Sequence, residues 1–155
     1  MGQTLVEYEK DKGFWIAETM MQLVLHYIVQ EMEKPEHLIP NKSDLLEDTK
    51  FHINGYSGGH MYFSLFDKVS SPADEQAMIQ ILDNVKTTLQ NKGDLISVEE
   101  LMSIPTDDLT LKYILDKKPF PTAELIRVMD ALIQMLERTW PHKDYEMDLK
   151  WKYFD

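Results

Sequence analysis

The sequence predicts a mainly α-helical fold: a compact domain of about five helices around a central N-terminal helix, with a possible small β element at the C-terminus. Apolar residues recur at helical spacing in several segments, and serine or proline residues that favour helix starts precede them. Strict alternation of apolar and polar residues, typical of a strand, occurs near the C-terminus. With 155 residues, 43% of them hydrophobic, the chain can bury a core, so we expect one domain over residues 1–155.

The first predicted helix runs from about Lys12 to Lys34 and is apolar around most of its circumference. Such a helix belongs in the middle of a fold. Pro35 should end it, because the residue before a proline avoids the helical region. The polar residues that remain recur every four positions and form one narrow line: Glu18, Gln22, His26 and Gln30. We interpret this line as a set of satisfied hydrogen bonds within the core.

The next two helices are predicted from their start and stop signals. Ser43 and Asp44 can cap a second helix, which Asn54-Gly55 should end. Ser71-Pro72 is a favoured start for a third helix, which Gly93 should end. Residues 60–66 are compatible with either a strand or a helix.

Two helices follow in the second half of the chain. Ser97 and Glu100 form a capping-box pattern, which predicts a short helix ending near Ile104. Residues 105–120 should be irregular or form short turns. The last helix should run from Pro121 to about Trp140.

The C-terminal segment, residues 144–155, contains the predicted strand. Its apolar side chains alternate with charged ones from Asp144 to Tyr153. A strand needs a partner. The candidates are residues 4–8, residues 60–66, or a strand of another chain, which would make a homodimer through the C-terminal segment.

Charge and composition narrow the function classes. Sixteen basic and twenty-seven acidic side chains give a net charge of −11, which repels nucleic acid and attracts a basic protein. The alternative is that the negative charge only keeps the protein soluble. There is no cysteine, so a disulfide or thiolate metal site is excluded. The N-terminus lacks a signal-peptide pattern and the longest apolar stretch contains polar groups, so we expect a cytoplasmic protein without membrane contact.

The sequence contains one pattern that resembles a catalytic motif. Residues 55–59 fit the G-x-S-x-G pattern around a nucleophilic Ser57, with Asp83 or Asp130 and then His142 in the order of a serine hydrolase. That motif requires strands of a parallel sheet upstream, where the sequence predicts helices, so we interpret it as a glycine-rich loop and expect no enzyme activity.

The histidines do not form a recognised metal motif either. None of them pairs with another histidine or a carboxylate at the spacing of a helical metal motif: His26, His37, His52, His60 and His142. The sequence therefore predicts neither a metal site nor a cofactor.

The candidate partner-binding surface is the segment 94–111. It carries five acids without a lysine or arginine, and three apolar residues that we expect to be exposed. Acids around an apolar centre suit contact with a basic partner, although capping acids on a solvated helix face give the same pattern. The candidate contact residues are Asp94, Glu99, Glu100, Leu101, Met102, Asp107, Asp108 and Leu109.

The segment from Gly13 to Ile28, with its Trp15-x-x-Glu18 opening, precedes a glycine-rich centre, a helix after Ser71, a short capped helix and a final amphipathic helix. Over about residues 10–140 this order resembles immunity proteins encoded beside bacterial polymorphic toxins. The resemblance implies inhibition by tight binding to a toxin domain, often a basic nuclease. A self-associating scaffold and a serine hydrolase using Ser57 remain as alternatives.

Overall fold

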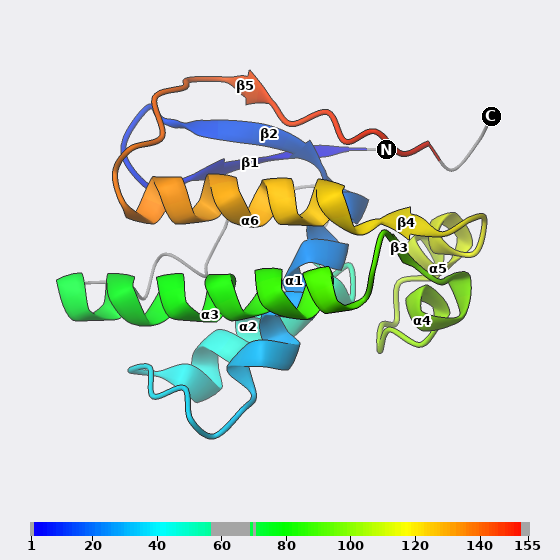
Figure 1. The fold of residues 1–155 in the computed structure, drawn as a ribbon, viewed down its shortest axis with the longest axis horizontal. Helices are drawn as coiled ribbons and strands as arrows, with labels where there is room; N and C mark the ends of the chain where they lie inside the picture. Colours follow the sequence, from blue (N-terminus) through cyan, green and yellow to red (C-terminus); the bar gives the residue numbers. More distant parts are fainter. Residues whose placement is uncertain (1, 57–68, 70, 153–155) are drawn as a thin grey trace.

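Helices and two small sheets make up the part of the chain that the computed structural model describes, residues 2–56, 69 and 71–152. Figure 1 shows their arrangement. In chain order the elements are β1 (Gln3–Glu7), β2 (Gly13–Ala17), α1 (Glu18–Met32), α2 (Lys42–Ile53), α3 (Pro72–Asn91), β3 (Leu95–Ile96), α4 (Val98–Met102), α5 (Leu109–Leu115), β4 (Phe120–Pro121), α6 (Thr122–Leu136) and β5 (Tyr145–Glu146). The fold is therefore rich in helix but α/β, whereas a mainly α fold was predicted.

Helix α1 is the central element, as the sequence predicts: every residue in it except Glu18 and Gln30 is buried. Its predicted start is wrong, because residues 13–17 form β2. In that strand Phe14 and Ile16 are fully buried while Trp15 between them is half-buried, which is the alternation of a strand. Pairing with β1, antiparallel from Gln3 opposite Ala17 to Glu7 opposite Gly13, satisfies the backbone that a helix would otherwise have satisfied internally.

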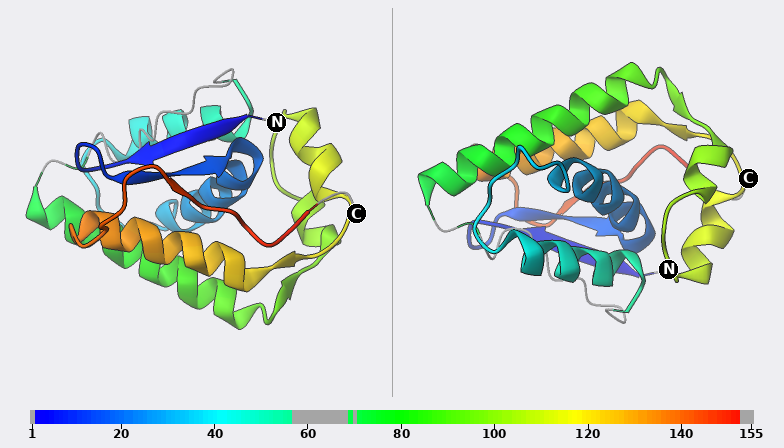
Figure 2. Two further views of the ribbon diagram at one scale, coloured as in Figure 1. Left: turned by 90° about the horizontal axis from the view of Figure 1, so that it is seen from above. Right: turned by 90° about the horizontal axis from the view of Figure 1, so that it is seen from below.

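Helices α3 and α6 lie side by side, and α3 also packs on α1 (Figures 1 and 2). Both α3 predictions are confirmed: the Asp74 amide donates to Ser71 Oγ at 3.2 Å, and the helix stops just before Gly93. Helix α6 ends at Leu136, four residues earlier than predicted. Trp140 is buried beyond that end, where it packs on Phe14 and its Nε1 donates to the Gly13 carbonyl at 3.1 Å.

Helices α2, α4 and α5 agree with the predictions only in part. The predicted cap of α2 is wrong, because the helix starts at Lys42 after Asn41, which has a positive φ of 57° and makes no side-chain cap bond. Ser97 caps α4 as predicted, with its Oγ accepting from the Glu100 amide at 3.1 Å. The segment expected to be irregular contains α5, whose first turn is capped by Asp108.

The C-terminal segment pairs with its own chain. Strand β5 lies parallel to β2, and the Met147 amide donates to the Trp15 carbonyl at 2.8 Å. The predicted strand is confirmed only over the two residues of β5, but the alternation of burial continues past it, because Met147, Leu149 and Trp151 are buried and the residues between them are exposed. Of the two partners predicted within the chain, residues 4–8 are not the one used, because residues 3–7 pair with the other edge of β2; residues 60–66 lie outside the described residues.

Beyond β5 the segment runs along the molecule to the end where α4 and α5 lie (Figure 2). There Trp151 packs on Phe120 and donates from Nε1 to the Pro119 carbonyl at 2.8 Å. Within the described ranges, no helix combines the length and the apolar character that a bilayer span requires.

Candidate protein-binding groove

A groove of about 590 Å³ lies between the C-terminal half of α1, the end of α2 and the loop that joins α4 to α5. One of its walls, residues 103–107, belongs to the acidic segment that the sequence singles out. Its lining mixes apolar and polar groups: His26, Val29, Gln30, Glu33, Lys50, Ile53, Asn54, Ser103, Pro105, Thr106 and Asp107.

The two loop walls of the groove are joined by hydrogen bonds across about fifty residues of sequence. The Thr106 hydroxyl donates to the Ile53 carbonyl at 2.6 Å, and the Asp107 amide donates to Asn54 Oδ1 at 2.9 Å. Gly55 has a φ of +77°, and a Cβ there would clash with the Asp108 carboxylate. Only glycine therefore allows this close approach of the two walls.

Gln22, from the polar line on α1, forms hydrogen bonds to both of these walls. Gln22 is buried, and its side-chain amide donates to the His52 and Ile53 carbonyls at 3.2 Å and to Asp108 Oδ2 at 2.8 Å. The prediction of satisfied hydrogen bonds is thus confirmed for Gln22. It does not hold for Glu18, whose buried Oε1 has no hydrogen-bond partner among the described residues.

His26, one turn further along the line, forms part of the groove wall. It is 8% exposed, and its burial lowers its pKa to about 4. Burial is the largest cause of this low pKa; Glu100 and Glu33 act to raise the pKa, and nearby Lys92 acts to lower it. The imidazole is therefore neutral at pH 7 and offers one hydrogen-bond donor and one acceptor to whatever enters the groove.

The structure divides the predicted contact residues into supporting and exposed groups. Glu100 accepts a hydrogen bond from the Tyr27 hydroxyl at 2.6 Å and forms an ion pair with Lys92 at 3.0 Å. Burial alone would raise the pKa of Glu100, but the bonds from Tyr27 and Lys92 outweigh it and lower the pKa. Asp108 Oδ1 accepts from the Thr110 and Leu111 amides. Both carboxylates therefore hold the fold together.

The other predicted contact residues differ in exposure. Leu101 is only 2% exposed and belongs to the core, so the expectation that it is exposed is wrong. Met102 and Leu109 are exposed as expected, at 38% and 78%. Asp94, Glu99 and Asp107 are exposed too, and Asp107 lies in the groove wall.

Two exposed aromatic residues beside the groove were not identified from the sequence. Phe51 is 48% exposed and Tyr56 is 54% exposed, and their rings meet edge to face at 5.5 Å. The Tyr56 hydroxyl donates to Asp107. Phe51 lies on α2 between the buried Thr49 and Ile53, so no feature of the helix sequence marks it as exposed. Tyr56 next to Gly55 was the available signal, because an aromatic residue in a tight turn is seldom buried.

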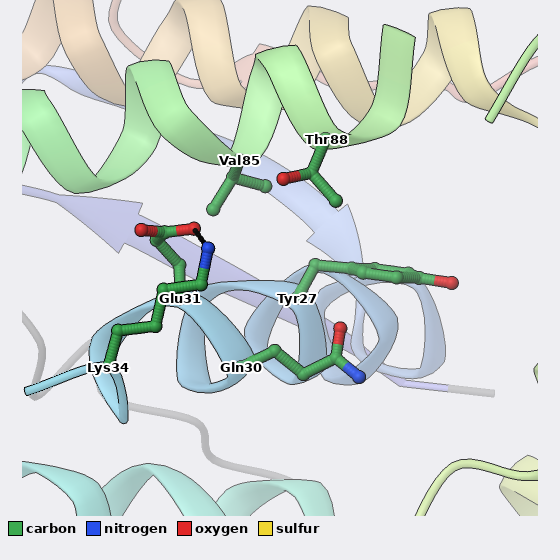
Figure 3. Close-up of a pocket in the computed structure, with 6 residues that line it drawn as sticks. All are labelled: Tyr27, Gln30, Glu31, Lys34, Val85 and Thr88. Atoms are coloured by element: carbon green, nitrogen blue, oxygen red, sulfur yellow. Dashed lines mark ion pairs between the residues drawn. The ribbon is translucent and has the colours of Figure 1, made fainter. Parts of the chain in front are cut away.

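A second cavity, of about 310 Å³, lies between α1 and α3 (Figure 3). It is lined by Tyr27, Gln30, Glu31, Lys34, Val85 and Thr88. Gln30 lines both cavities, so the polar line of α1 reaches the surface between them.

Residues proposed for the serine-hydrolase alternative are placed only in part, because Ser57 lies outside the described residues. The chain enters that position from helix α2 and the turn at 54–56, whereas a nucleophile elbow is entered from a strand. Asp130 forms an ion pair with Lys86, and the His142 ring stacks on Tyr145.

Comparisons of the chain with protein-family models, with curated proteins and with solved structures found no significant match.

Proposed function

We propose that this protein binds and neutralises a basic partner protein, as an immunity protein binds a toxin domain. The observation that carries the proposal is the groove, whose walls internal hydrogen bonds hold in place and beside which the exposed rings of Phe51 and Tyr56 contact each other. The contact surface consists of the groove lining together with Phe51, Tyr56, Met102 and Leu109.

The composition of this surface suits a protein partner. Interfaces concentrate their binding energy in a few aromatic and apolar anchors surrounded by polar groups. Phe51, Tyr56 and Leu109 supply such anchors. Asp107 supplies negative charge in the groove, where the charge of Glu33 is balanced by Lys50 at 3.3 Å. Because the whole chain carries a charge of −11, it attracts a basic domain from a distance and discriminates against an acidic one.

The chemistry of the groove supports binding rather than catalysis. Two hydroxyl groups line the groove, those of Ser103 and Thr106. The Ser103 hydroxyl donates to the Glu100 carbonyl at 2.6 Å and not to a catalytic base. The low pKa of His26 makes it a weak base near neutral pH. A groove of this kind offers shape, apolar area and charge, which are the properties of an interface.

The test begins with the genes beside the one that encodes this chain: the proposal expects a toxin domain there, which then serves as the partner, and its absence would contradict the function. We expect co-expression to protect cells from that domain, and the purified proteins to form a stable complex. Phe51→Ala and Leu109→Ala should each weaken binding by tenfold or more, as expected for anchor residues. Leu38→Ala is the matched control, because Leu38 is 86% exposed in the loop after α1 and lies outside the proposed surface. Equal affinities for all three variants would contradict the proposed surface, and failure to protect or bind would contradict the function.

A further inference from the structure

A cluster of possible metal ligands lies where α1 ends, apart from the groove. Glu31 belongs to the last turn of α1, and Glu36 and His37 belong to the turn that follows it. One ligand atom from each of the three lies within 4.8 Å of the others. Glu31 is 4% exposed and His37 is 8% exposed, while Glu36 faces solvent.

We propose that Glu31, Glu36 and His37 bind a divalent transition-metal ion of the Zn²⁺ type. One imidazole nitrogen and two carboxylate oxygens are a donor set that such ions prefer, and water would complete the coordination. The buried position of two of the three ligands strengthens their attraction for a cation, because the local dielectric constant is lower than that of water. This proposal does not depend on the proposed binding of a partner protein.

The groups around Glu31 fit this role. His37 Nε2 and Glu31 Oε2 are hydrogen-bonded to each other at 2.5 Å, so a metal ion held by both atoms replaces the proton between them and parts them to about 3 Å. From α3, Asn84 Nδ2 donates to Glu31 Oε2 at 3.1 Å and holds the carboxylate in position, as hydrogen-bonding partners of metal ligands commonly do.

Lys34 is the group that a metal ion must displace. Its Nζ lies 3.0 Å from Glu31 Oε1, and Figure 3 shows this ion pair at the edge of the cavity between α1 and α3. The Lys34 side chain is 52% exposed on a flexible stem. It therefore balances the charge of Glu31 in the metal-free protein and can turn into solvent when a divalent cation takes over that charge.

The full-length protein is titrated with ZnCl₂ in a calorimeter, and its thermal unfolding is followed with and without Zn²⁺. We expect one Zn²⁺ per chain, and a rise in unfolding temperature that EDTA reverses. Glu36→Gln changes an exposed side chain and should leave the fold intact, yet it should lower Zn²⁺ affinity about tenfold or more. Glu33→Gln and His142→Gln are the matched controls, because both side chains are exposed and lie outside the cluster.

A second measurement tests the role of His37 without a substitution. In NMR spectra of the unmodified protein, Zn²⁺ should shift the ring signals of His37 and leave those of His142 in place. No binding at stoichiometric Zn²⁺, binding that Glu36→Gln leaves unchanged, or unshifted His37 signals would each overturn the proposal.

Discussion

Single residues set how closely the two walls of the groove approach each other. Gly55 shows this most sharply, because it combines a left-handed backbone with a neighbouring carboxylate that leaves no room for a Cβ. Gly93 has a similar φ, +89°, but open space around it. A comparison of substitutions at Gly55 and Gly93 therefore separates the cost of backbone strain from the cost of a steric clash.

Replacing Gly55 with alanine should destabilise the protein by about 2–3 kcal/mol, because it adds a clash with the Asp108 side chain to the strain of a positive φ. The clash also displaces the carboxylate that caps α5. Gly93→Ala should lower the free energy of unfolding by only about 1 kcal/mol, the strain alone. Urea unfolding at pH 7 measures both, and equal losses would show that the contact with Asp108 is not tight.

His26 predicts a pH dependence of stability. In the folded protein its burial lowers the pKa to about 4, against an ordinary value of 6.5, while the unfolded chain takes up a proton near that ordinary value. Below pH 6.5 protonation therefore favours the unfolded state, and the penalty grows until the folded protein is protonated as well, near pH 4. We expect a loss of about 3 kcal/mol at most over this range.

The measurement is urea unfolding at intervals from pH 7 to pH 4. His26→Gln should flatten the curve over that interval, whereas His142→Gln, which changes an exposed histidine, should leave its slope unchanged. Because Glu100, Glu33 and Lys92 all act on His26, the variant is compared with the unmodified protein in one buffer of constant ionic strength.

At the scale of elements, local patterns predicted some features and missed others: the cap at Ser43 and Asp44 was wrong, and the start of α5 after Asp108 was not predicted. The cap at Ser71, the stop before Gly93 and the alternation in the C-terminal segment depend on neighbouring residues, and the structure has all three. Residues 13–17 were assigned to the central helix because their strand character depends on pairing with β1, which helical periodicity does not register.

The groove could not be predicted from local sequence patterns. One wall was identified from its charge, but the contacts that create the groove join Ile53 and Asn54 to Thr106 and Asp107, and no periodicity links residues that far apart. Sequence also does not separate a carboxylate that caps or supports, such as Glu100, from one that is free to meet a partner, such as Glu99.

The C-terminal segment makes a prediction at the same scale. Trp151 packs on Phe120 and is 8% exposed, so the segment is part of the core and not an appended tail. Trp151→Ala should lower the free energy of unfolding by about 3 kcal/mol, while Lys152→Ala, which changes an exposed neighbour, should change it by less than about 0.5 kcal/mol. Thermal or urea unfolding distinguishes the two. A loss near zero for Trp151→Ala would mean that the segment detaches in solution.

At the scale of the whole molecule, the net charge should affect the association rate constant, and the apolar anchor residues should affect the dissociation rate constant. A net charge of −11 acts over distances comparable to the Debye length, so it governs how fast a basic partner arrives. Phe51 and Leu109 act only after contact, so they govern how slowly the partner leaves. The free energy of binding alone does not separate these contributions, but kinetics do.

The association rate with a basic toxin domain should therefore fall at least tenfold as salt rises from about 50 to about 500 mM, while the dissociation rate changes little. Charge reversal of Glu99 and Asp107, two exposed acids of the predicted surface, should slow association and reduce its salt dependence. Reversal of Asp83 and Glu137, exposed acids on α3 and after α6, changes the net charge equally and is the control. Stopped-flow measurements give both rates. If the two double variants slow association equally, the charge acts through the molecule as a whole and segment 94–111 has no special part in capture.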